Sequence, residues 1–134
     1  MFRKNVALLL LLALVASPLA LADSPFETFT EARLAELQAD GKPVLVEVYA
    51  DWCSTCRRQS PILTELLEDD QFSGITGLKL DWDAQRSQAQ DLGAPRQSTL
   101  ILFVGNQRIG TSIAETHPER LRDFLAQADT APGR

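Results

Sequence analysis

The chain has 134 residues, which leaves room for one domain. It carries 13 lysine and arginine residues against 18 aspartate and glutamate residues, a net charge of −5. An acidic chain without a basic cluster argues against binding to nucleic acid and to anionic membrane surfaces.

Residues 1–22 have the pattern of a secretory signal peptide. Arg3-Lys4 supplies a positive start, residues 6–16 form an apolar core of eleven residues, and Ala20-Leu21-Ala22 marks a cleavage site. The apolar core is too short to span a bilayer comfortably. We therefore predict an exported protein whose domain is residues 23–134, with 11 basic against 18 acidic residues and a formal charge of −7.

The first half of this domain predicts a helix, a buried strand and a second helix. Ser24-Pro25-Phe26-Glu27 has the form of a capping box, which predicts a helix over about 25–39. The apolar run over 43–50 predicts a strand. A helix over about 53–69 follows, and Pro61 should kink it because proline removes an interior hydrogen bond.

The second half predicts three more strands and two more helices. In chain order they are a strand over 75–82, a short helix over 84–92, strands over 99–104 and 108–113, and a helix from about residue 116, with a frayed tail over 129–134. The last two strands flank Gly105-Asn106 and predict a hairpin. This alternation indicates an α/β domain with a mixed sheet and helices on both faces.

The two cysteines of the chain lie in Trp52-Cys53-Ser54-Thr55-Cys56, directly after the buried strand. A Cys-x-x-Cys pair at a strand-to-helix junction can interconvert dithiol and disulfide. The free amides and the positive dipole end of the helix should face the first sulfur, so Cys53 is the predicted nucleophile. Cys56 follows one helical turn later and is the predicted resolving thiol.

Two other interpretations of the pair are half of a zinc site and a structural disulfide. Structural zinc usually takes four cysteine or histidine ligands, and the chain offers only His117 besides the pair. A disulfide across so short a loop would constrain the unfolded chain little. Redox exchange is therefore the favoured chemistry, and we expect neither a metal nor a cofactor in the single chain.

The run Val46-Glu47-Val48-Tyr49-Ala50-Asp51-Trp52-Cys53-Ser54-Thr55-Cys56, with Pro61 after it, resembles the active-site strand, turn and kinked helix of the thioredoxin superfamily. With Gly41-Lys42-Pro43-Val44 before it, the run is most similar to periplasmic members, including the C-terminal domain of DsbD-type transmembrane thiol reductases. The resemblance implies a thioredoxin fold and a periplasmic thiol–disulfide oxidoreductase. It favours reduction of protein disulfides, with a membrane thiol reductase as electron donor. We expect a monomer.

The resemblance also gives roles to residues around the pair. Glu47 falls where the superfamily usually carries a buried acid beneath the second cysteine, and Lys79 falls where many members carry a nearby lysine. A charged residue in an apolar strand is costly unless it is exposed, paired or functional. We expect Glu47 to take the proton from Cys56, with Lys79 in support; the alternative is a plain ion pair. Trp52 is expected to shield the nucleophile and contact substrate, although core packing would also explain it.

The sequence departs from the superfamily pattern at Gln97-Ser98-Thr99. The family has a cis-proline immediately before the threonine, facing the cysteines and pairing its backbone with substrate. Here Ser98 takes that place, where a cis bond would cost ~3–4 kcal/mol. Ser98 and Thr99 are thus the expected substrate-binding pair of an altered docking surface, and Ala114 replaces a glycine that commonly borders the groove.

Loss of the proline raises a second hypothesis about function. Within the superfamily this proline is thought to keep metals off the cysteine pair. The chain could then be a thiol-binding or metal-binding module in which Cys53 and Cys56 from two chains share a zinc ion or an iron–sulfur cluster.

Overall fold

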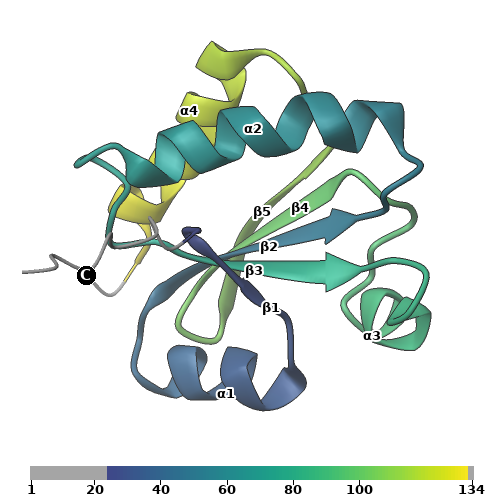
Figure 1. The fold of residues 1–134 in the computed structure, drawn as a ribbon. Helices are drawn as coiled ribbons and strands as arrows, with labels where there is room; N and C mark the ends of the chain where they lie inside the picture. The colour runs from purple at the N-terminus through teal and green to yellow at the C-terminus, as the bar shows by residue number, and fades with distance from the viewer. Residues whose placement is uncertain (1–23, 133–134) are drawn as a thin grey trace, which may run out of the picture.

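A five-stranded mixed sheet organises residues 24–132, the part of the chain that this computed structural model describes (Figure 1). The strands are β1 (Phe26–Thr28), β2 (Pro43–Tyr49), β3 (Thr76–Asp81), β4 (Thr99–Val104) and β5 (Gln107–Ile113). Their order across the sheet is β1-β3-β2-β4-β5. β1, β3 and β2 are parallel, whereas β4 runs antiparallel to β2 and β5. The predicted mixed sheet is confirmed.

Helices cover both faces of this sheet, as the sequence predicts. They are α1 (Glu31–Ala39), α2 (Ser54–Glu68), α3 (Arg86–Asp91) and α4 (Pro118–Ala126), and a 3-10 turn over Gln127–Thr130 follows α4. α1 and α3 lie on one face, and α2 and α4 lie on the other (Figure 1).

The central strand β2 is buried because helices cover it on both sides. Its valines, Val44, Val46 and Val48, pack into the core under α1 and α3, and Leu45 packs into the core under α2 and α4. Side chains alternate along a strand, so Glu47 leaves β2 on the same side as Leu45. A carboxylate therefore lies in the layer between the sheet and α2, fully buried.

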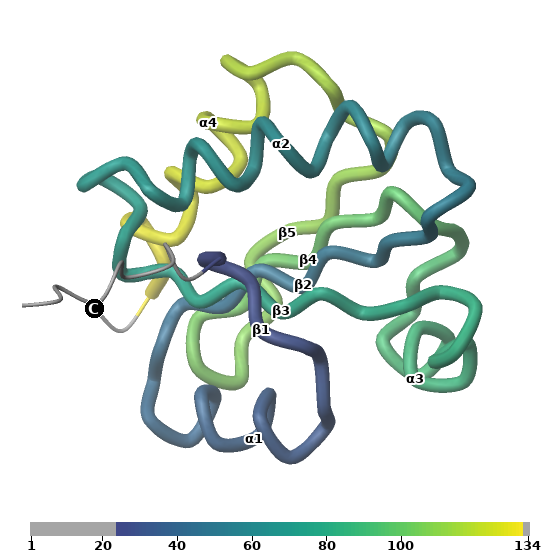
Figure 2. Tube along the Cα trace, in the orientation of Figure 1, coloured from purple at the N-terminus to yellow at the C-terminus, as the bar shows by residue number. Residues whose placement is uncertain are grey.

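The cysteine turn lies at one end of the sheet. Figure 2 shows the connection from β2 to α2 at the same end of the molecule as α3. Thr99 at the start of β4 pairs with Val48, and Ile113 at the end of β5 pairs with Thr99. The segments 50–53, 95–98 and 114–117 therefore meet here, and we call this region the cysteine end.

The predicted first helix is wrong over residues 25–30. Residues 26–28 form β1, which pairs with β3, and α1 begins only after its N-cap, Thr30. Ser24 Oγ accepts a hydrogen bond of 3.2 Å from the Phe26 amide, so it closes a turn instead of capping a helix. The ring of Phe26 lies over Gly77, where an added Cβ would come within 2.6 Å of it. This packing overrides the local helix signal.

The carboxy-terminal boundary also differs from the prediction. The 3-10 turn extends to Thr130 and Ala131 is buried, so the tail expected to fray from residue 129 is ordered over its first residues. Pro61 lies inside α2, and β4 and β5 form the expected hairpin. The predicted signal peptide lies outside the described residues. Within residues 24–132, no helix combines the length and apolar character needed to cross a membrane.

Candidate active site

The cysteine pair lies where β2 gives way to α2, as predicted. Cys53 is the N-cap residue of α2, and its Sγ accepts a hydrogen bond of 3.1 Å from the amide of Cys56. The Cys53 amide donates to the carbonyl oxygen of Ala50 at 3.1 Å. A helix amide therefore points at the first sulfur, and negative charge there is stabilised.

Both cysteines are free thiols set below the surface. Cys53 is 4% exposed and Cys56 is 0% exposed, and both pack with Ala50, Tyr49 and Trp82. Burial, together with the hydrogen bond to Cys53, raises the pKa of the Cys56 thiol to about 11, although backbone hydrogen bonds at Ala50 and Ser98 oppose the rise. At neutral pH Cys56 is therefore protonated, and it needs a base before it can act as a nucleophile.

Glu47 supplies a carboxylate in the buried layer. It pairs with Lys79 on β3, and its Oε2 lies 3.5 Å from Lys79 Nζ. This contact is an ion pair longer than a good hydrogen bond, and neither carboxylate oxygen has a hydrogen-bond partner. Burial raises the pKa of Glu47, and the charge of Lys79 opposes the rise. The structure thus brings together Glu47 and Lys79, as predicted.

Tyr49 packs against the cysteines and is influenced by the charge of Glu47. Burial raises the pKa of the Tyr49 phenol, and the charges of Asp51, Glu47 and Cys56 raise it further. Glu47 and Cys56 therefore both lie within electrostatic reach of one phenol group.

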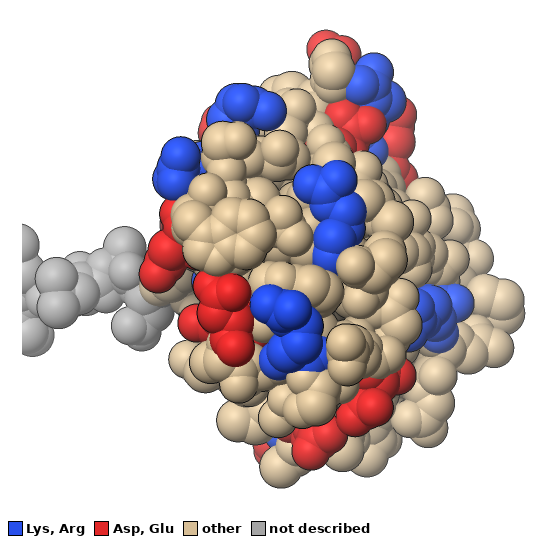
Figure 3. Space-filling model, turned by 90° about the vertical axis from the view of Figure 1, so that its right-hand side faces the viewer, with Lys and Arg blue, Asp and Glu red and all other residues tan. Residues whose placement is uncertain are grey.

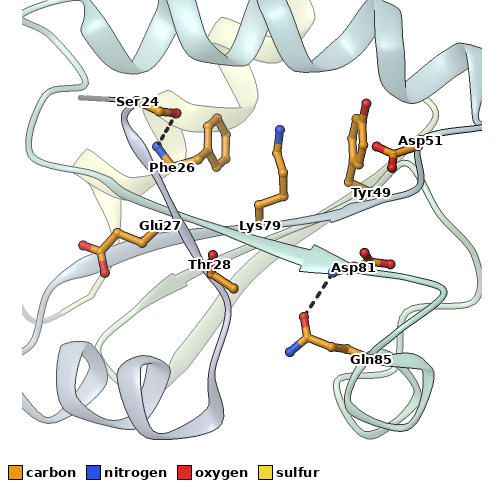
Figure 4. Close-up of a pocket in the computed structure, with 9 residues that line it drawn as sticks. All are labelled: Ser24, Phe26, Glu27, Thr28, Tyr49, Asp51, Lys79, Asp81 and Gln85. Atoms are coloured by element: carbon orange, nitrogen blue, oxygen red, sulfur yellow. Dashed lines mark hydrogen bonds between the residues drawn. The ribbon is translucent and has the colours of Figure 1, made fainter. Parts of the chain in front are cut away.

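Lys79 lies between two aromatic rings in a pocket of about 320 Å³ (Figure 4). Its Nζ is 4.5 Å from the centroid of the Tyr49 ring and 5.3 Å from that of the Phe26 ring, and it donates to Ser60 Oγ at 2.9 Å. Asp51 and Asp81 also line the pocket. The ammonium group thus reaches from this pocket to the buried carboxylate.

Trp52 is the most exposed large apolar side chain of the described residues, at 57%. Its Nε1 donates a hydrogen bond of 2.8 Å to Asp83 Oδ2. Arg57 Nη1 donates to the Asp51 carbonyl oxygen at 2.8 Å. The loop before Cys53 is therefore held from both sides, and the ring of Trp52 is presented beside the cysteine for contact with another molecule.

Charges of both signs surround the cysteine end. Figure 3, which views this end, shows basic and acidic side chains interspersed among residues without a formal charge. Arg86 stacks on Trp82, 4.3 Å from the ring centroid, and Trp82 packs against the cysteines. Arg96 lies in the segment before Ser98 and donates to the Gln97 carbonyl oxygen at 3.3 Å.

The segment before β4 differs from the superfamily pattern in backbone geometry as well as in sequence. No peptide bond within residues 24–132 is cis, so the bond before Ser98 is trans. Ser98 has φ +57°, in the left-handed region, and its amide donates to the Val48 carbonyl oxygen at 2.8 Å. Its hydroxyl donates to the Gln97 carbonyl oxygen at 2.6 Å, and that of Thr99 donates to the Arg96 carbonyl oxygen at 2.6 Å. Both side chains are fully buried, so their hydroxyls are engaged inside the loop.

The remaining candidates take structural positions. His117 is the N-cap residue of α4, and its Nδ1 lies 3.0 Å from Glu115 Oε1. Within residues 24–132 there is no group of three or more His, Cys, Asp or Glu side chains placed to hold a metal ion. A site shared by two chains would need both sulfur atoms at the surface, and the complete burial of Cys56 gives that hypothesis no support.

Sequence reasoning missed three contributors to the site. Tyr49 could have been found, because it has the strand parity of Glu47. Ser60 could also have been found, because it follows Cys56 by four residues on one helix face. Phe26 carried no usable signal, since its segment was predicted to be helical.

The sheet, the helices and the cysteine N-cap together define the architecture of a thiol–disulfide oxidoreductase, and comparison with known proteins agrees. The Thioredoxin family model matches residues 25–127. Thioredoxin from Alicyclobacillus acidocaldarius subsp. acidocaldarius is 33% identical over 99 residues, which cover 74% of this chain and 93% of that protein. Thioredoxin from Chlamydia muridarum is 36% identical over 84 residues, which cover 63% of this chain and 80% of that protein.

A solved structure extends the likeness to three dimensions. Trxlp from Edwardsiella tarda EIB202 has a TM-score of 0.72 and 41% identity, over 75% of this chain and 97% of that one. The chain belongs to the thioredoxin family. It has the thioredoxin fold, and its activity is thiol–disulfide exchange.

Proposed function

We propose that this chain is an exported oxidoreductase that reduces disulfides in other proteins. The observation that carries the proposal is the hydrogen bond of 3.1 Å from the Cys56 amide to Cys53 Sγ at the start of α2. A donor aimed at this sulfur stabilises the charge of the attacking form. The exposed Trp52 ring beside it offers an apolar surface to a protein substrate.

The exchange proceeds in two steps. The Cys53 thiolate attacks one sulfur of the substrate disulfide, the substrate S–S bond breaks, and its other sulfur leaves as a thiolate. Cys56 then attacks Cys53 Sγ, which breaks the mixed disulfide and releases the second substrate thiolate. Two electrons pass to the substrate, and Cys53 and Cys56 become a disulfide.

Glu47 is the proposed base for the second step. The Cys56 thiol, with a pKa of about 11, must lose its proton as it attacks. Burial raises the pKa of the Glu47 carboxyl, so it can hold that proton more readily than an exposed carboxylate. Lys79, 3.5 Å away, is the counter-charge that keeps the carboxylate available in its ionised form.

The compartment and the direction of transfer complete the proposal. The signal-peptide pattern of residues 1–22 and the likeness of the active-site run to periplasmic proteins support export to the periplasm. In an oxidising compartment a reductase needs a dedicated electron donor, and we assign that role to a membrane thiol reductase acting on a monomer of this protein. A mature protein that does not begin at Asp23, or a reduction potential well above about −180 mV, would overturn these assignments.

The direct test is reduction of insulin disulfides by residues 23–134 with a chemical thiol donor in metal-free buffer. We expect activity in the wild type and none in Cys53→Ser. The Cys56→Ser variant should accumulate a mixed disulfide, which mass spectrometry detects. An inactive wild type that purifies as a coloured or zinc-containing dimer would instead support the metal-binding module.

A further inference from the structure

The side chain of Ser60 contacts Lys79, one of the two charged residues beneath the cysteines. Ser60 lies on α2, four residues after Cys56, and is 9% exposed. Its Oγ accepts a hydrogen bond of 2.9 Å from Lys79 Nζ, the atom that lies 3.5 Å from Glu47 Oε2. A hydroxyl on the helix thus fixes the position of an ammonium group that comes from the sheet.

The position of the Lys79 ammonium group matters because Glu47 depends on it. Glu47 has two fully buried oxygens without a hydrogen-bond partner in the described residues. The Lys79 charge, 3.5 Å from Oε2, opposes the rise in the pKa of Glu47 that burial causes.

The ammonium group of Lys79 has an alternative position in the pocket of Figure 4. Its side chain is 36% exposed and lines the open pocket with Asp51 and Asp81. Lysine has a flexible four-carbon stem and loses rotamer entropy when it is held in one position. The bond to Ser60 therefore opposes rotation of the ammonium group into the pocket and away from Glu47.

We propose that Ser60 is a positioning residue for Glu47, which it serves by holding the Lys79 ammonium group beside the carboxylate. This proposal deepens the function proposed above and rests on the role of Glu47 as the base. Ser60 touches neither substrate nor a reacting sulfur. Its effect is on the pH at which Glu47 is ionised.

Other titratable groups lie on the elements packed against Glu47. Lys79 faces it from β3, and Tyr49 lies on its own strand. Cys56 lies on α2, and its charge, like that of Glu47, raises the pKa of Tyr49. β4 presents the apolar Leu100 at the paired position. The ionisation of Glu47 should be followed with both cysteines reduced, so that Cys56 remains protonated below pH 9 in every variant.

The experiment is a carbon-13 NMR titration of the Glu47 carboxyl in the reduced protein, comparing wild type, Ser60→Ala and Thr64→Ala. Thr64 is the matched control, because its hydroxyl lies on α2 but donates to the Ser60 carbonyl oxygen at 3.0 Å. We expect the Glu47 midpoint to rise by about one pH unit in Ser60→Ala, a tenfold change in proton concentration, and to stay in place in Thr64→Ala. Ser60→Thr, which keeps the hydroxyl, should restore the wild-type midpoint.

A double-mutant cycle separates positioning from packing. If Ser60 acts through Lys79, Ser60→Ala should move the midpoint less in a Lys79→Met background than in the wild type. An unchanged midpoint in Ser60→Ala, or an equal rise in Thr64→Ala, would overturn the proposal. The activity of Glu47→Gln tests the proposed function separately: normal decay of the mixed disulfide in that variant would remove Glu47 as the base while leaving the titration result intact.

Discussion

The amide of Ala114 donates a hydrogen bond of 2.9 Å to the carbonyl oxygen of Ser98, and both residues have φ +57°. Among the non-glycine residues of 24–132, these two alone have positive φ. They lie at the cysteine end, where the Ser98 backbone also acts to lower the pKa of the Cys56 thiol. Left-handed backbone costs about 1–2 kcal/mol for a residue with a side chain, so conformational strain is concentrated next to the redox centre.

Replacing Ala114 by glycine should relieve part of this strain. Glycine adopts φ +57° without a steric cost, although it loses more entropy on folding than alanine does. We expect Ala114→Gly to raise the free energy of unfolding by about 0.5–1 kcal/mol in urea denaturation. The control is Ala35→Gly on the exposed face of α1, where the same change should cost about 1 kcal/mol. A loss of stability at both positions would contradict the strained geometry at Ala114.

The Ser98→Pro variant, which would restore the superfamily residue, should be destabilised. Proline requires φ near −65° and has no amide hydrogen, whereas Ser98 has φ +57° and donates to Val48 at 2.8 Å. We expect Ser98→Pro to lower the free energy of unfolding by about 2–4 kcal/mol. Ser98→Gly, which tolerates the backbone, should stay within about 1 kcal/mol of wild type. A proline variant as stable as wild type would mean that segment 95–98 can be rebuilt.

Features of the site that depend on local sequence could be predicted, whereas features that depend on contacts between distant segments could not. The positions of Cys53 and Cys56 follow from a local signal, since an apolar strand that ends in a helix places both sulfurs. Glu47 could be assigned to the buried layer because strand alternation fixes its side. The left-handed backbone at Ser98 could not be predicted. It depends on hydrogen bonds with Val48 on β2 and with Ala114, which follows β5.

The strand β1 was missed for the same reason, because it depends on a contact with a distant part of the chain. Ser24 to Glu27 satisfies a helix-capping pattern, yet the chain pairs with β3, where Phe26 fits against Gly77. That choice depends on a glycine about fifty residues away, which a local pattern cannot register. The error also hid the aromatic contact between Phe26 and Lys79.

The two thiols should differ sharply in alkylation of the reduced protein. Cys56 is fully buried and its pKa is raised to about 11, so it is a protonated thiol across the neutral range. Mass spectrometry after brief iodoacetamide treatment at pH 8 should find one label, on Cys53, with the second appearing only as the pH approaches 11. Cys56→Ser should keep the single label, and Cys53→Ser should take none at pH 8. Equal labelling of both cysteines at pH 8 would contradict this assignment.

The buried carboxylate should make stability depend on pH. Burial raises the pKa of Glu47 above its value in the unfolded chain, so the folded state holds this proton more tightly. The contribution of protonated Glu47 to stability is complete below about pH 4.5 and is lost as the pH rises through the folded-state pKa. Glu47→Leu removes the ionisable group and leaves an apolar side chain beside Leu45, while Lys79, already partly exposed, can turn into the pocket.

Urea denaturation at pH 4 and pH 8 tests this directly. We expect Glu47→Leu to be more stable than wild type by about 1–3 kcal/mol at pH 8, where an unsatisfied buried carboxylate is removed, and by much less at pH 4. Glu65→Leu is the control, because Glu65 is an exposed carboxylate on α2 and its loss should change stability by no more than about 0.5 kcal/mol at either pH. If Glu47→Leu gained the same stability at both pH values, better packing would explain the gain. The ionised carboxylate would then not destabilise the folded state. A gain at pH 8 accompanied by slower decay of the mixed disulfide would show that Glu47 is retained for exchange at the expense of stability.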